Sequence, residues 1–77
     1  MIVFIRAGGL RVLCEHPRMG WVCLTEVEIE RENAVYGGRV VPVAPTRANR
    51  ARLGRFLGQV ARNVRAGLVE PFRLEVR

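Results

Sequence analysis

The N-terminal third of the chain alternates apolar and polar positions in a way that predicts strands. Residues 2–6 are rich in β-branched and aromatic side chains, and glycines at 8–9 predict a two-residue hairpin turn before a second strand at 10–15. A longer turn leads to a third strand over residues 21–31, where glutamates alternate with other residues at period two. The pattern therefore predicts an N-terminal β-meander.

Pairing these strands through their turns predicts two sheet faces. The hairpin turn sets Val3 opposite Cys14, and we align the third strand by setting Cys14 opposite Cys23. The face expected to form the core is Val3, Ile5, Ala7, Leu10, Val12, Cys14, Cys23, Thr25 and Val27. On the other face Arg11 is expected to pair with Glu26. That face also carries a contiguous apolar surface, the predicted interface patch: Ile2, Phe4, Leu13, Val22 and Leu24.

Small monomers rarely leave an apolar surface like the predicted interface patch exposed to water. Three uses are open: coverage by the C-terminal strand or another part of the chain, a homodimer interface, or docking of a partner protein. We favour the homodimer.

The second half of the chain predicts two more strands around one long helix. Residues 34–43 have the pattern of a fourth strand, in which glycines 37–38 form a bulge or the true hairpin turn and Pro42 indicates an edge or strand end. Residues 72–77 alternate and predict a half-buried fifth strand. The expected fold is α+β in one domain, residues 1–77. An antiparallel sheet of four to five strands packs against one long amphipathic helix, in the order β-β-β-β-α-β.

The predicted helix, residues 46–66, has one apolar stripe. Thr46 is the expected N-cap and Gly67 the left-handed residue that ends the helix. Gly54 and Gly58 lie beside the stripe and each costs about 1 kcal/mol relative to alanine, so they indicate a close approach of helix to sheet. The stripe is Leu53, Phe56, Leu57, Val60, Val64 and Leu68.

Arginine supplies all thirteen basic residues, and its placement is uneven. Residues 1–32 hold four arginines and five glutamates, whereas residues 33–77 hold nine arginines and two glutamates. A GC-rich genome explains the missing lysine but not this segregation. Arg47 and Arg50 lie at the helix N-terminus, where acids are preferred, which predicts an anion bound there. The full predicted anion-binding set is Arg39, Arg47, Arg50, Arg52, Arg55, Arg62 and Arg65.

No combination of side chains predicts catalysis. The chain has no serine or aspartate, so it lacks a Ser-His-Asp set, and its single histidine, His16, is expected on the surface of a turn. Cys14 and Cys23 are expected to be buried free thiols. Together with His16 they would give only three metal ligands without paired CxxC spacing, so neither metal nor cofactor is expected. We therefore expect a protein that is not an enzyme.

Two binding functions remain. The first is nucleic-acid binding, with the arginine face of the helix on the phosphates of DNA or RNA. The second is a protein-interaction regulator or inhibitor encoded by a mobile element, which binds an acidic or nucleoprotein partner. In small size, charged face and lack of a catalytic set the chain resembles anti-CRISPR proteins in type, without a shared motif. It has no apolar run of membrane-spanning length and no signal peptide, so we expect a cytoplasmic location.

Overall fold

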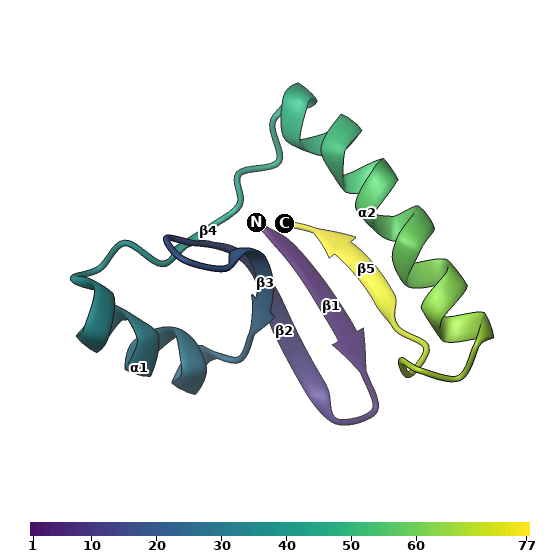
Figure 1. Ribbon diagram of the computed structural model, residues 1–77, viewed down its shortest axis with the longest axis horizontal. Helices are drawn as coiled ribbons and strands as arrows, with labels where there is room; N and C mark the ends of the chain where they lie inside the picture. Colours follow the sequence, from purple (N-terminus) through teal and green to yellow (C-terminus); the bar gives the residue numbers. More distant parts are fainter.

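The computed structural model describes all residues from 1 to 77 and confirms the expected α+β class. Two helices and a five-stranded antiparallel sheet follow in the order β-β-β-α-β-α-β. The two ends of the chain lie side by side, at the start of the first strand and the end of the last (Figure 1). The elements are β1 (Ile2–Arg6), β2 (Gly9–His16), β3 (Gly20–Leu24), α1 (Glu26–Tyr36), β4 (Val41–Pro42), α2 (Arg47–Arg65) and β5 (Arg73–Val76).

The sheet lies between the two helices and contributes a core to each. Its strand order is β3-β2-β1-β5, and β4 pairs with the C-terminal end of β2. Because successive side chains of a strand point to opposite faces, neighbouring residues of β1 and β2 enter different cores. In Figure 1, α1 lies near β3 and α2 runs alongside β5. The core under α2 is Ile2, Phe4, Leu13, Val43 and Leu53. The core under α1 is Val3, Val12, Cys14, Leu24 and Val40.

The glutamate-rich segment predicted as the end of the third strand is the helix α1. The hydroxyl of Thr25 accepts a hydrogen bond from the Glu28 N–H at 3.2 Å, and Thr25-x-x-Glu28 has the spacing of a capping box. Glutamates in the first turn also favour a helix N-terminus. Gly37 ends the helix with a φ of 64°, so glycines 37–38 form neither a bulge nor a hairpin turn. The predicted fourth strand is reduced to the two residues of β4.

Polar side chains hold α1 to the rest of the chain. Glu28 forms an ion pair with Arg11, with 3.3 Å between Oε1 and the guanidinium nitrogen, in place of the predicted pair with Glu26. Asn33 uses both ends of its amide on the Val40 backbone: Oδ1 accepts from the N–H at 2.9 Å, and Nδ2 donates to the carbonyl at 3.1 Å. These contacts replace the apolar stripe of an ordinary amphipathic helix.

Two apolar residues of α1 lie on its outer side. The side chains of Val27 and Val35 are 54% and 75% exposed, and no residue of the helix is buried. Only Ile29 and Tyr36 pack against the core, and both are half-buried. With so few apolar residues facing inward, α1 lacks the stripe that identifies a helix, and its alternating glutamates predicted a strand instead.

The register of β3 differs by one residue from the prediction. Cys14 pairs with Val22 rather than with Cys23, because the hairpin closes at the pair His16–Gly20, where Gly20 takes a φ of 74°. A shift of one residue moves every side chain of a strand to the opposite face. The β1–β2 register is shifted by two residues, which leaves the faces unchanged.

The predicted interface patch is therefore not a surface. Ile2, Phe4 and Leu13 are buried beneath α2, at 0%, 6% and 0% exposure. Val22 and Leu24 lie on the opposite face, toward α1. The chain buries four of the five side chains itself and half-buries Val22, so no contiguous apolar surface is left for the homodimer interface expected there.

The bounds and caps of α2 agree with the prediction. Thr46 caps it by accepting from the Asn49 N–H at 3.2 Å. At the other end Leu68 N–H bonds to the Asn63 carbonyl and Gly67 takes a φ of 75°, which is a Schellman ending. No helix of the protein combines the length and apolar character needed to cross a membrane.

The expected close approach at Gly54 and Gly58 is wrong. Both are exposed, and a Cβ placed on either would have no heavy atom within 4 Å. Leu53 is the only buried residue of α2, and Phe56 and Leu57 are half-buried against the same core. These long side chains, rather than the glycines, meet the sheet.

Candidate functional site

The arginines predicted to bind anions are all exposed, and none of them has a carboxylate partner. The ion pairs of the protein involve Arg11, Arg73 and Arg77 instead. Helix α2 thus carries six arginines and no acid, whereas α1 carries four glutamates and one arginine. The exposed set is Arg39, Arg47, Arg50, Arg52, Arg55, Arg62 and Arg65.

Four of these arginines share one side of α2, which we call the crest: Arg47, Arg55, Arg62 and Arg65. At about 100° per residue they fall within an arc of about 80° on the side away from the sheet. Arg62 also donates to the Gln59 side chain at 2.6 Å, which orders its guanidinium along the helix. The crest follows a helix of 19 residues, about 28 Å long.

The remaining three predicted arginines lie off the crest. Arg52 points to the flank of α2 that faces β3, and Arg50 leaves the first turn on the other flank, at the angles that helical geometry gives them. Arg39 lies just after α1, where its Nε donates to the Tyr36 carbonyl at 2.9 Å. The structure therefore does not place Arg39 on the same helix as the others.

The N-terminus of α2 has two free backbone donors beside the expected arginine pair. Thr46 satisfies the Asn49 N–H through its hydroxyl and the Arg50 N–H through its carbonyl. The N–H groups of Arg47 and Ala48 make no hydrogen bond within the chain. An anion bound at this terminus stays a prediction.

A hollow of about 520 Å³ opens between α2 and the start of β3. The Cζ atom of Arg52 lies 4.1 Å from the centroid of the Trp21 ring, in a cation–π contact. Phe56 meets the same ring edge-on, with 6.3 Å between ring centroids. We call this feature the Trp21 hollow, and it is lined by Met19, Gly20, Trp21, Arg52, Arg55 and Phe56.

Sequence reasoning did not assign Trp21 to the site. The residue stands at the start of a predicted strand, and the strand pattern does not show which helix that face meets. The available signal was compositional, because Trp21 is the only tryptophan and Arg52 and Arg55 are one helical turn apart. The observed register of β3 places Trp21 on the face of the sheet that meets α2.

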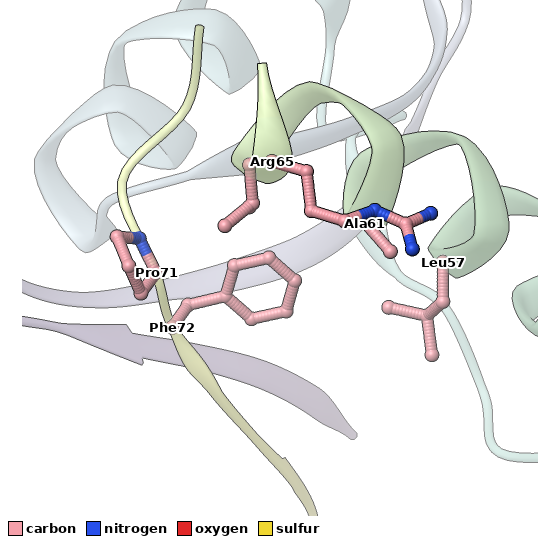
Figure 2. A pocket seen from close by; sticks show the side chains of 6 residues that line it. Leu57, Ala61, Arg65, Pro71 and Phe72 are labelled. Atoms are coloured by element: carbon pink, nitrogen blue, oxygen red, sulfur yellow. The ribbon is translucent and has the colours of Figure 1, made fainter. Parts of the chain in front are cut away.

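The other flank of α2 borders an apolar groove of about 430 Å³. Figure 2 shows the Phe72 ring pointing from the segment before β5 toward the helix, with Pro71 next to it in the chain. A smaller space of about 130 Å³ under the helix shares Phe72 with this groove. The α2–β5 groove is lined by Leu57, Ala61, Val64, Arg65, Pro71 and Phe72.

His16 is buried, at 4% exposure, so the expected surface position is wrong. Its Nδ1 accepts hydrogen bonds from the N–H groups of Arg18 and Met19, at 3.1 and 3.2 Å. The ring proton is therefore on Nε2, which donates to Glu32 at 2.9 Å. Tyr36 packs edge-on against the imidazole at 4.6 Å between centroids. Both ring nitrogens form hydrogen bonds within the chain, so neither is free to act on a substrate.

The two cysteines are free thiols that face opposite sides of the sheet. Cys14 faces α1 and Cys23 faces α2, so the two thiols and His16 do not converge on one metal position. For the same reason the two cysteines do not have the geometry that a disulfide requires. Burial raises the pKa of Cys14. Burial, reinforced by the charge of Cys14, raises the pKa of Cys23 to about 11. Thiols with raised pKa values are weak nucleophiles at neutral pH.

The site is thus an uncompensated cationic helix, bordered on one flank by an aromatic hollow and on the other by an apolar groove. Such an arrangement binds polyanions by charge and planar or apolar groups by contact. Comparison of the chain with protein-family models, curated proteins and solved structures found no match.

Proposed function

We propose that the protein is a non-enzymatic module that binds nucleic acid through its phosphate backbone, using the crest of α2. The observation that carries this proposal is the row of exposed arginines, none of which pairs with a carboxylate. A guanidinium binds phosphate through two parallel hydrogen bonds. A helix of about 28 Å runs along about eight base pairs of duplex.

The energetic argument rests on charge repulsion within the crest. Arginines three, seven or eight residues apart on one helix side repel one another, and no glutamate at helical spacing offsets this. A phosphate backbone supplies the missing negative charge and releases its own counterions. If about five phosphates are neutralised, affinity for duplex falls about 500-fold between about 50 and about 200 mM salt.

Fluorescence anisotropy with labelled random-sequence duplex and single-stranded DNA and RNA tests the proposal at these two salt concentrations. We expect micromolar binding at low salt that weakens steeply at the higher concentration. The double variant Arg55→Gln/Arg62→Gln should bind more weakly, with a salt slope shallower by about two phosphate contacts.

The matched control is Arg31→Gln/Arg73→Gln, which removes the same charge from the α1 side of the sheet. It should leave affinity within about twofold, because these arginines are distant from the crest. If both double variants lost the same affinity, the effect would come from net charge alone, which would contradict a role for the crest. Absence of binding to every oligomer at low salt would sink nucleic-acid binding altogether.

The α2–β5 groove favours a second candidate, a regulator or inhibitor that binds a protein component of a nucleic-acid-handling complex. Four of its six lining residues are apolar, and Leu68 beyond the end of α2 is 76% exposed. An acidic partner would contact the arginines, and its apolar side chains would enter the groove. In either case we propose a cytoplasmic location, where the two thiols stay reduced. Binding to a protein but to no oligomer would select this candidate.

A further inference from the structure

The Trp21 hollow joins an aromatic stacking surface to the edge of the crest. Arg52 lies over the Trp21 ring at 4.1 Å, and its guanidinium has no carboxylate partner. Arg55, one helical turn further along α2, belongs both to the crest and to the lining of the hollow. A ligand with a planar ring next to an anionic group therefore has a surface for each part.

We propose, on the basis of the nucleic-acid binding proposed above, that the Trp21 hollow receives one unpaired base of a single-stranded nucleic acid. The base stacks on the guanidinium of Arg52, which itself rests on Trp21, and the adjacent phosphate binds Arg55. Proteins stack unpaired bases on aromatic rings and on arginine planes. A base within a duplex is already stacked on both sides, so the hollow selects single strands.

The size and rim of the hollow agree with this occupant. Its volume of about 520 Å³ lies within the range of small-molecule sites, about 300–1,000 Å³. Gly20 leaves room at the rim, because a Cβ there would have no heavy atom within 4 Å. Met19 is 54% exposed, and its polarisable thioether is a favourable neighbour for an aromatic base.

Charge at the rim determines on which side of the Trp21 ring the backbone of the bound strand passes. The Trp21 Nε1–H donates to the Glu15 carboxylate at 3.3 Å, which fixes the orientation of the indole. The same carboxylate repels phosphate from its side of the ring. The backbone therefore passes on the side of Arg55 and continues along the crest.

Three oligomers of about ten units test the base subsite: a thymidine single strand, an abasic strand with the same number of phosphates, and a duplex. Anisotropy measures binding, and the emission of Trp21, the only tryptophan in the chain, reports stacking. We expect the thymidine strand to bind about tenfold more tightly than the abasic strand and to quench Trp21 emission. The abasic strand and the duplex should bind without quenching.

Paired variants separate base stacking from charge. Arg52→Gln should remove the roughly tenfold preference for thymidine over abasic strands. Arg62→Gln loses the same charge ten residues further along α2 and should weaken both strands equally, so that the preference stays. Both positions are exposed, so the fold should tolerate either change.

The outcomes distinguish the two proposals. Equal binding of thymidine and abasic strands, with unchanged Trp21 emission, overturns the base subsite and leaves backbone binding by the crest intact. A duplex that binds and quenches as strongly as the single strand also overturns it. If no oligomer binds at low salt, both proposals fail, and a protein partner becomes the candidate.

Discussion

Helices α1 and α2 cover opposite faces of one sheet, but different forces hold them there. α1 is attached by polar contacts, in which Glu28 meets Arg11 and Asn33 binds the Val40 backbone, while two of its valines face solvent. α2 is attached by apolar side chains, with Leu53 buried in the core of its face. The charges of α1 are therefore partly used in folding, whereas those of α2 have no carboxylate partner in the chain.

This difference also affects how each helix is read from sequence. An apolar stripe at period 3.6 identifies a helix that packs by burial, as in α2. A helix that packs through hydrogen bonds leaves no such stripe, so the pattern alone did not identify α1. The following experiments break or sharpen this contrast, from the largest expected effect to the smallest.

Leu53→Ala should cause the largest loss of stability. Removing a buried leucine costs about 2–5 kcal/mol in transfer free energy and cavity formation. Urea unfolding followed by circular dichroism measures the change in unfolding free energy. Ile29→Ala on α1 should cost less, because Ile29 is only half-buried. A larger loss at Ile29 than at Leu53 would show that burial also dominates the attachment of α1.

Asn33→Leu should destabilise the protein through lost hydrogen bonds. The variant removes two bonds to the Val40 backbone and leaves a buried donor and acceptor unpaired, which costs about 1–3 kcal/mol. The control is Asn63→Leu on α2, whose side chain makes no hydrogen bond and which should change stability by less than about 0.5 kcal/mol. Chemical unfolding of both variants checks the difference, and equal effects would argue against polar attachment of α1.

Gly58→Ala should stabilise the protein by about 0.5–1 kcal/mol, because Gly58 lies in an exposed helix interior with open space around its Cα. A rise in melting temperature is the expected readout, and Gly54→Ala should behave alike. A fall in melting temperature at either position would show that the glycine is closely packed, as the sequence pattern indicated and in contradiction to the structure.

At neutral pH the ionisation of the Cys23 thiol beneath α2 should show the smallest effect, because the thiol is protonated in both the folded and the unfolded state, and alkaline titration reveals it. The pKa of Cys23 rises from 9.0 to about 11 on folding, so between these pH values the unfolded chain releases a proton that the folded chain keeps. Unfolding free energy should therefore fall as pH rises through this window. Cys23→Ala should flatten that part of the profile. An unchanged slope in the variant would assign the pH dependence to other groups.

Local signals explain what could be predicted. The limits of α2 follow from Thr46 and Gly67, and the arginine row follows directly from its spacing on a helix. The capping-box spacing of Thr25 and Glu28 was also present, but the period-two glutamates concealed it. Trp21 and His16 could not be placed, because the face of β3 and the burial of a turn depend on a register that differs by a single residue.

The sequence by itself determined the α+β class, the limits of α2 and the row of uncompensated arginines, because caps, periodicity and charge are properties of short segments. The tertiary structure alone decided that the predicted interface patch is covered by α2, that α1 is a helix held by polar pairs, and that Trp21 lies under Arg52. Each of these depends on strand register and on side chains far apart in the sequence, whose meeting no local pattern encodes.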